Sequence, residues 1–485
     1  MERFSGQSWF IRALLIVTVV TSARLVLLAY NRTDLFVDEA QYWLWGQNPA
    51  FGYFSKPPMI AWLIGAVTGL VQSDDAFWVR MPGAPLHGLT ALILATLAAR
   101  IGGPKAAVWT AATYVTLPMT AIGSLLISTD TVMAPFYAAA LLFHHRLLQH
   151  HRMRDALLVG AMVGLACLSK YAGIYLPIGM ALAGLLRNDL RPTRTEVAVI
   201  AVVVLAIVTP NLLWNLGNRF STFAETEQNI GWIREANPLS WLDFRDVFDF
   251  WATQLAVVGP IVFVAILTGF VLFRRQPFLV ALSLPALAVV SVQSILYRAY
   301  ANWAVGSYFA GSILAVLVLA GHPRLRMVSL VTNTAICLAF PLLTLFPEIT
   351  RDGRPLLHRY LGRADVSRQI LALSASQGAV AVVSSSREII ADLFYTGAGT
   401  GQSFYTPLPE NSPTNHYEQF YAMPLDLTGP VLLVAPRAPG CPHVQSALDL
   451  AGTAYEKTTF AAYLVDADCV RRFRADLPEA PAAAP

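Results

Sequence analysis

The chain has 485 residues, of which 55% are hydrophobic and 13% are charged, and its mean hydropathy is +0.52. Charged residues are about half as frequent as in soluble domains. The composition therefore excludes a disordered chain, a disulfide-stapled secreted module and an ordinary cytosolic enzyme, and it indicates a protein that crosses a membrane many times. The net charge of +4 comes from 34 basic and 30 acidic residues, a surplus too small for a nucleic-acid-binding surface.

Apolar runs of membrane-spanning length follow one another up to about residue 346. The first stands behind Arg3 and Arg12 and lacks a small-residue cleavage site, so we expect a retained helix. Alternate loops carry compact basic clusters, which the positive-inside rule places in the cytoplasm. These features predict an all-α polytopic membrane bundle over residues 1–346, with runs near 11–30, 78–100, 106–127, 131–148, 156–186, 196–216, 253–273, 277–296, 303–320 and 325–346.

Two segments need separate treatment. The run 156–186 would form a single helix about 46 Å long at ~1.5 Å per residue, and it has arginines at both ends. The alternation of basic loops survives only if this run crosses twice, as a hairpin whose tip is Ser169-Lys170-Tyr171. The stretch 59–72 is too short to span and is predicted to be an interfacial helix within the external loop 31–77. About eleven crossings follow from this arrangement.

Beyond about residue 350 the sequence changes character, and residues 347–474 are predicted to form a small α/β domain outside the cytoplasm. The expected elements are a buried strand over 378–383, a helix opened by a capping box of Ser385 and Glu388, a strand over 431–434, and a helix from His443 to Leu450. Residues 475–485, rich in Ala and Pro, are predicted to be a disordered tail.

The four cysteines divide into two pairs. Cys441 and Cys469 fall in the C-terminal domain, and a disulfide and two free thiols both remain open, because a sequence does not give the Cα separation. Cys167 and Cys337 lie in apolar runs, where core packing is the ordinary role.

The first external loop carries the strongest candidates for chemistry. Asp38 and Glu39 directly follow the first spanning helix, and ionisable groups at the edge of the hydrocarbon are costly unless they serve a function. Lys56 in the same loop and Lys170 at the hairpin tip are on the external face, where basic residues are scarce. Snorkelling to lipid headgroups is the alternative explanation for the lysines, and helix capping is the alternative for Asp130.

Several short motifs resemble polytopic lipid-dependent glycosyltransferases of the protein O-mannosyltransferase and aminoarabinose-transferase type, which have the GT-C fold. The resemblance covers roughly residues 10–320. The motifs are Asp38-Glu39-Ala40-x-Tyr42, Gly52-Tyr53-Phe54-Ser55-Lys56-Pro57-Pro58, Arg80 after Trp78, Thr129-Asp130, Leu168-Ser169-Lys170-Tyr171, Trp214-Asn215, Thr222-Phe223 with Asn229, and Tyr300-Ala301-Asn302-Trp303.

The resemblance implies transfer of a sugar from a polyprenyl-phosphate carrier to an envelope acceptor at the outer face of a bacterial inner membrane, by an inverting single displacement. Asp38 is then the expected catalytic base, with Glu39 as its neighbour or substitute. Lys56, Lys170 and Arg80 are expected to bind the donor phosphate. The residues expected to contact substrate are Tyr42, Tyr53, Asp130, Tyr171, Asn302 and Trp303.

Several alternatives stay open at this stage. The acceptor could be a glycolipid such as lipid A, a polysaccharide or a protein, and the sequence does not name the sugar. A transporter or flippase of an anionic lipid, or a non-catalytic scaffold, would use similar charges without bond chemistry. The loop 217–252 is either a lid or a headgroup-level segment. No cofactor is expected. A divalent metal shared by Asp38, Glu39 and Asp130 stays open but is not favoured, because two lysines already supply positive charge. The four histidines of one loop are interpreted as solvated residues: His144, His145, His150 and His151.

Overall fold

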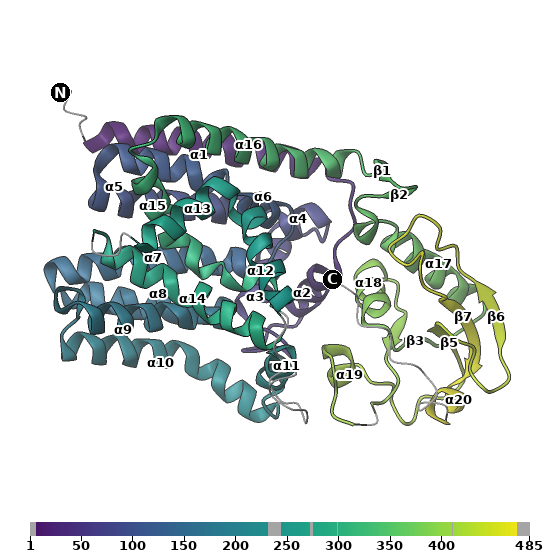
Figure 1. Cartoon of the computed structure of the whole chain (residues 1–485). Helices are drawn as coiled ribbons and strands as arrows, with labels where there is room; N and C mark the ends of the chain where they lie inside the picture. Colours follow the sequence, from purple (N-terminus) through teal and green to yellow (C-terminus); the bar gives the residue numbers. More distant parts are fainter. Residues whose placement is uncertain (1–5, 231–243, 272–274, 298, 410, 473–485) are drawn as a thin grey trace.

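The computed structural model describes residues 6–230, 244–271, 275–297, 299–409 and 411–472. An N-terminal bundle of helices lies beside a C-terminal domain built on a sheet, and the chain passes from one to the other after the last long helix of the bundle (Figure 1). The predicted tail 475–485 falls outside the described residues, as do Trp232 and Trp241 of the predicted lid.

The bundle consists of long apolar helices and short elements that turn the chain between them. They are α1 (Gly6–Ala29), α2 (Val37–Gln47), α3 (Met59–Val71), α4 (Ala76–Arg80), α5 (Gly83–Val115), α6 (Pro118–Leu125), α7 (Thr129–His150), α8 (Met153–Ser169), η1 (Tyr171–Ile174), α9 (Tyr175–Leu186), η2 (Asn188–Leu190), α10 (Arg194–Gly217), α11 (Ser221–Ile230), α12 (Phe244–Val258), α13 (Pro260–Val271), α14 (Pro277–Leu296), η4 (Ala301–Ala304), α15 (Gly306–Leu319) and α16 (Pro323–Leu345).

Within the described residues, five helices are long and apolar enough to cross a membrane, and a sixth is added if α12 and α13 count as one broken span. The long α5 is interrupted at Gly103, where the loop between two predicted runs was expected. Other predicted runs fold as shorter helices, such as α9 and α15. The number of crossings therefore remains a prediction, whereas the mostly helical bundle is confirmed.

The predicted single run 253–273 is wrong, because α12 and α13 meet at a bend of 112°. Gly259 joins them with φ of +86°, a conformation that favours glycine. The side chain of Asn333 packs directly on Gly259, in the space where a Cβ would be, and its Nδ2 donates to the carbonyl of Val258 at 3.1 Å. Pro260 then starts the second helix, since it needs no backbone donor in the first turn.

The predicted hairpin over 156–186 is confirmed. Helix α8 ends at Ser169, Lys170 is extended, and η1 and α9 carry the chain back. The ring of His151, just before α8, bonds the carboxylate of Glu196 in α10 at 3.1 Å, so the chain has returned to the end of the bundle at which α8 began. The tip of the hairpin, with Lys170, consequently lies at the other end.

The C-terminal domain has a five-stranded mixed sheet in the order β4-β3-β5-β7-β6. Strands β4, β3 and β5 are parallel, and β7 runs antiparallel to both β5 and β6. The elements are β1 (Thr350–Arg351), β2 (Arg354–Pro355), η5 (His358–Tyr360), α17 (Arg363–Ser376), β3 (Ala381–Ser384), α18 (Arg387–Thr396), β4 (Ser403–Tyr405), α19 (His416–Phe420), β5 (Pro430–Ala435), β6 (Val444–Ala447), β7 (Ala461–Asp466) and α20 (Ala467–Arg472).

Two local predictions for this domain are wrong. The N-cap of α18 is Ser386 rather than Ser385, and its Oγ accepts from the amide of Ile389. Glu388 is therefore one position too early for a capping box, and it pairs instead with Arg363 at 3.1 Å. The predicted helix at His443–Leu450 is instead the edge strand β6, since pairing with β7 satisfies its backbone groups and overrides local helix propensity.

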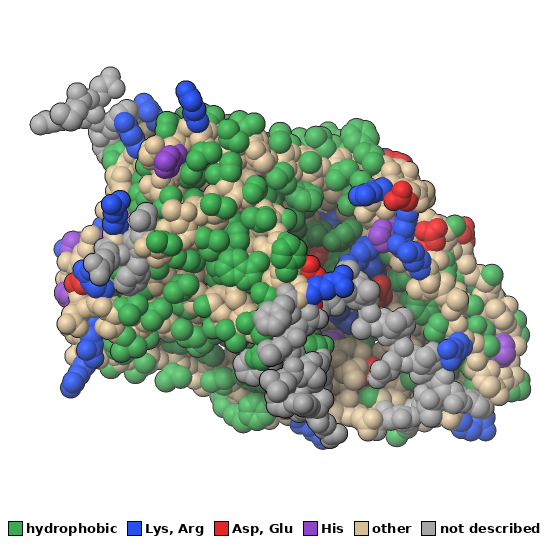
Figure 2. Space-filling model, in the orientation of Figure 1, with side chains coloured by type: hydrophobic (Ala, Val, Ile, Leu, Met, Phe, Trp, Pro, Cys, Tyr) green, Lys and Arg blue, Asp and Glu red, His purple; other side chains and the backbone are tan. Residues whose placement is uncertain are grey.

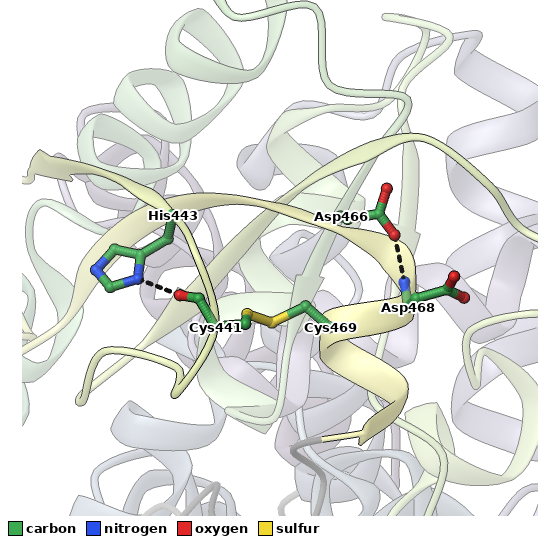
Figure 3. Close-up of a disulfide and its surroundings, with 5 residues drawn as sticks. All are labelled: Cys441, His443, Asp466, Asp468 and Cys469. Atoms are coloured by element: carbon green, nitrogen blue, oxygen red, sulfur yellow. Dashed lines mark hydrogen bonds between the residues drawn. A yellow bond between two sulfur atoms is a disulfide. The ribbon is translucent and has the colours of Figure 1, made fainter.

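Cys441 and Cys469 form a disulfide, with their Cα atoms 6.1 Å apart (Figure 3). The bond ties the loop before β6 to the start of α20, and His443 Nδ1 donates to the carbonyl of Cys441 at 2.8 Å. A disulfide persists in an oxidising compartment. Cys167 and Cys337 are free thiols. Cys167 packs against the apolar core, as expected, whereas the buried Cys337 lies beside the guanidinium of Arg24 and donates its thiol to the carbonyl of Thr116 at 2.9 Å.

A shared hydrophobic cluster holds the first loop of the bundle against the C-terminal domain. Trp45 of α2 and Ile60 of α3 are fully buried in it together with Ile389, Ile390 and Leu393 of α18. Burying side chains of this size contributes roughly 1.5–3 kcal/mol each. Helix α18 is thereby fixed against α2, which carries the predicted catalytic acids.

Candidate active site

Helix α2 directs its two neighbouring acids to different surroundings. Consecutive residues of a helix point about 100° apart. The Asp38 side chain is 46% exposed, whereas that of Glu39 is only 2% exposed. Only Asp38 is therefore open to a substrate.

Glu39 forms a buried ion pair with Arg80 of α4. The two side chains meet at 2.7 Å, and the guanidinium also donates to the carbonyl of Thr33 at 3.1 Å. The remaining acceptor sites of the Glu39 carboxylate take the amides of Phe36 at 2.9 Å and Ile127 at 3.0 Å. A carboxylate and a guanidinium that are so fully paired fix the first loop on the bundle, and the structure gives the predicted catalytic role of Glu39 and phosphate-binding role of Arg80 no support.

Asp38 instead forms an ion pair with Arg387 of the C-terminal domain. Arg387 is the first residue of α18, and its Nη2 lies 2.5 Å from Asp38 Oδ1 while its Nε donates to Gln41 Oε1 at 2.9 Å. The sequence analysis missed this arginine, because nothing in a chain pattern links residues 349 positions apart. One usable signal was its position at the start of a helix that follows a buried strand.

The surroundings of Asp38 keep it ionised. Protein atoms around it would by themselves raise the pKa of the carboxyl, but the charge and hydrogen bond of Arg387, together with the charge of Lys56, hold that pKa below its ordinary value. Asp38 is nevertheless reached by water, since its side chain is almost half exposed. In the space-filling view, acidic and basic side chains face the hollow between the bundle and the C-terminal domain (Figure 2).

Lys56 is the second cation whose charge lowers the pKa of Asp38. Its ammonium is 3.9 Å from Glu225 of α11, a loose contact, and its side chain is 31% exposed. The carbonyl of Lys56 accepts from the amide of Tyr53, which closes the turn before α3. Lys56 is thus a partly exposed cation at a long distance from its carboxylate partner. Such a cation can release the carboxylate and bind a phosphate in its place.

Lys170 and Asp130 form a second, tighter pair nearby. The Lys170 ammonium lies 2.8 Å from both carboxylate oxygens of Asp130, and Asn302 Nδ2 donates to one of them at 3.0 Å. The cap of α7 is Ser128, whose hydroxyl accepts from the amide of Thr131. Capping therefore does not explain Asp130, whose carboxylate holds the lysine at the hairpin tip.

Tyr42 lies close enough to both pairs for their charges to act on its phenol. It is 5% exposed, and burial, followed by the negative charge of Asp38, raises the pKa of its phenol; Glu225 and Asp130 contribute in the same direction. We call Asp38, Lys56, Asp130, Lys170, Glu225 and Arg387, together with Tyr42, the charged centre.

The other predicted substrate residues have structural contacts. Tyr53 donates its hydroxyl to the carbonyl of Trp45 at 2.9 Å, and the rings of these two residues stack. Tyr171 donates to Asn211 Oδ1 at 3.0 Å. Trp303 packs against Tyr300. Tyr171 adjoins Lys170 at the hairpin tip, whereas the contacts of Tyr53 and Trp303 place neither residue in the charged centre.

The histidines and the acids offer no evident metal site in the part of the chain that the structure describes, where no group of three or more His, Cys, Asp or Glu is arranged to hold an ion. The expectation that all four loop histidines are solvated is wrong for His144, which is fully buried. It lies in the last third of α7, inside the predicted run 131–148, and its ring packs against Phe278 of α14.

The comparisons with known proteins agree with this fold. Residues 55–214 match the family model described as dolichyl-phosphate-mannose-protein mannosyltransferase. The chain is 40% identical over 470 residues to the lipid A galacturonosyltransferase RgtD of Rhizobium johnstonii, an alignment that covers 94% of this chain and 98% of that protein.

Two solved structures share the fold across both domains. The crystal structure of ArnT from Cupriavidus metallidurans in the apo state is 15% identical with a TM-score of 0.63, and the structure of that protein bound to undecaprenyl phosphate is 16% identical with a TM-score of 0.66. Each comparison covers 95% of this chain and 98% of the other.

A helical membrane bundle with this fold and a cluster of acids and amines beside a sheet domain defines the class of GT-C membrane glycosyltransferases. The identity of 40% over nearly the whole length shows that the chain belongs to the family of lipid A galacturonosyltransferase RgtD. The predicted enzyme class and fold family are thereby confirmed.

Proposed function

We propose that this enzyme transfers galacturonic acid from a polyprenyl-phosphate carrier to lipid A at the periplasmic face of a bacterial inner membrane. The observation that carries the proposal is the 40% identity to a lipid A galacturonosyltransferase across both the bundle and the C-terminal domain. The polyprenyl-phosphate donor is supported by the neighbouring ArnT structure that is bound to undecaprenyl phosphate. About eleven crossings, with the basic loops in the cytoplasm, are part of the same proposal.

The charged centre suits a single displacement. An acceptor hydroxyl attacks the anomeric carbon, the bond from that carbon to the phosphate oxygen breaks, and the polyprenyl phosphate leaves with the electron pair. Asp38 takes the proton of the hydroxyl, a step for which an ionised carboxylate is required. The face of the sugar that is attacked lies opposite the departing phosphate, so the configuration inverts.

The cations of the charged centre differ in their readiness to bind the phosphate. Lys56 is held by Glu225 at only 3.9 Å, whereas Lys170 is held by Asp130 through two contacts of 2.8 Å. Lys56 is therefore the first ligand of the incoming phosphate, and Lys170 completes the clamp once its contact with Asp130 loosens. Positive charge placed where the phosphate departs stabilises the transition state.

The periplasmic location is supported by two independent features. The disulfide between Cys441 and Cys469 favours an oxidising compartment for the C-terminal domain. The hairpin tip with Lys170 lies at the bundle end away from the basic loops at 146–154 and 187–194. Both features support a periplasmic position for the charged centre.

The direct test is a transfer assay. Membranes that contain the protein are supplied with labelled polyprenyl-phosphate galacturonic acid and with lipid A. We expect labelled lipid A from the wild type, a loss of about 10²–10⁴-fold with Asp38→Asn, and normal transfer with Asp365→Asn, whose exposed carboxylate pairs with Arg368 on the surface. Label that crosses the membrane without product would indicate a flippase instead. Transfer by Asp38→Asn at the wild-type rate would refute the assignment of the base.

A further inference from the structure

A cavity lies between α9 and α10, at the end of the bundle far from the C-terminal domain (Figure 1). Its volume is about 480 Å³, and roughly 300–1,000 Å³ is typical of small-ligand pockets. His144 borders it, fourteen residues after Asp130 on the same helix, which corresponds to about 21 Å along α7. The cavity is thus separate from the charged centre.

The walls of the cavity are apolar and open toward lipid. Met180 and Ile200 contribute to the lining, as do Leu185 and Val197, whose side chains are 84% and 51% exposed. Large apolar side chains exposed on a membrane bundle face acyl chains rather than water. An occupant with a hydrocarbon tail fits these walls, whereas a free soluble anion would leave most of the lining uncovered.

Two arginines mark the rim. Arg191 and Arg194 both line the cavity and are exposed, and neither has an ion-pair partner among the residues that the structure describes. Arg187 of the same loop differs, because its guanidinium is paired with Asp189 at 2.9 Å. Two guanidinium groups that line one cavity, neither of them in an ion pair within the described residues, suit an anionic group such as a phosphate diester.

His144 adds a polar group deeper in the cavity. Its side chain is fully buried, and neither ring nitrogen has a hydrogen-bond partner within the described residues. A buried polar group without a partner costs free energy, so such groups in native proteins are normally satisfied. In a glycerophospholipid the ester carbonyls lie between the headgroup phosphate and the acyl chains, at the depth where an imidazole N–H would find an acceptor.

We propose that this cavity binds one anionic phospholipid, with its phosphate on Arg191 and Arg194, an ester carbonyl near His144 and an acyl chain between α9 and α10. Basic pockets between membrane helices recognise anionic headgroups in this way. The site is independent of the proposed transfer reaction, since none of its residues belongs to the charged centre.

Native mass spectrometry of the full-length protein in detergent tests the proposal. The protein is delipidated and then incubated with equal amounts of phosphatidylglycerol and phosphatidylcholine that carry identical chains. We expect at least fivefold more phosphatidylglycerol adduct than phosphatidylcholine adduct on the wild type. The double variant R191A/R194A should lose this preference, and R187A, the matched control, should keep it.

A second variant tests the apolar part of the site. A Cβ on Gly184 would meet no atom closer than 3.5 Å, so Gly184→Leu is tolerated by the backbone and fills the cavity. We expect it to reduce both lipid adducts at least threefold without lowering the unfolding temperature.

Three outcomes would overturn the proposal. The first is a preference for phosphatidylglycerol that R191A/R194A retains as fully as R187A does. The second is displacement of the bound lipid by millimolar inorganic phosphate, which would indicate a simple anion site. The third is a larger amount of undecaprenyl-phosphate adduct than of phosphatidylglycerol adduct, with the excess abolished in R191A/R194A. That result would identify the cavity as a binding site for the polyprenyl-phosphate carrier.

Discussion

Replacing Arg387 by alanine tests whether the C-terminal domain takes part in catalysis. The arginine makes a charge-assisted hydrogen bond of 2.5 Å to Asp38, and such bonds contribute ~1.5–3 kcal/mol. Both side chains are more than one third exposed, so water screens the pair and the lower end applies. We expect a loss in kcat/KM of about tenfold, since about 1.4 kcal/mol corresponds to a factor of ten.

The same variant changes the pH dependence in a defined direction. Arg387 is the largest of the interactions that lower the pKa of Asp38, so its removal leaves the effect of burial and raises that pKa. Because the base must be ionised, the acid limb of kcat/KM moves to higher pH. The assay is the labelled transfer reaction from pH 4 to 8, with Arg387→Lys to restore charge and Arg368→Ala as an exposed surface control. An acid limb that stays in place in Arg387→Ala would refute this account of the site.

Three further predictions address the fold and the donor site. Arg80→Met breaks the buried pair with Glu39 and should cost about 3–5 kcal/mol in the free energy of unfolding; a double variant with both residues replaced by Met should recover part of this loss in thermal unfolding. Burial lowers the pKa of His416 to about 3, so the folded state is at its most stable with respect to this group above pH 6.5 and loses about 2 kcal/mol of that stability by pH 5. His416→Phe should flatten the pH dependence of the unfolding temperature. An unchanged slope would contradict this prediction. Lys56→Ala should lower kcat/KM for the polyprenyl-phosphate donor roughly thirtyfold, about 2 kcal/mol, whereas the exposed Lys457→Ala should not, and equal kinetics would restore the snorkelling interpretation of Lys56.

The membrane bundle and the hairpin at Lys170 were accessible from the sequence, because hydropathy and loop charge act over twenty residues at a time. The break at Gly259 was not, since it depends on Asn333 from a distant helix packing where a Cβ would be. Strand β6 was missed for the same reason, because its partner β7 decides its conformation.

Within the site, sequence reasoning located Asp38, Lys56 and Lys170 but grouped Glu39 and Arg80 with them. A sequence by itself does not distinguish two adjacent acids. Once both are placed on a helix, their side chains point about 100° apart. Burial then separates the carboxylate of Glu39, which lies in the core, from that of Asp38, which is almost half exposed. Tertiary structure alone supplies that distinction.

The pairing of Asp38 with Arg387 also orders events during biosynthesis. A ribosome releases α2 long before α18, because 349 positions separate the two partners. Throughout that interval Asp38 lacks its arginine, and a chain that stops before residue 387 never acquires it. The site is therefore complete only after the C-terminal domain has docked on the first loop.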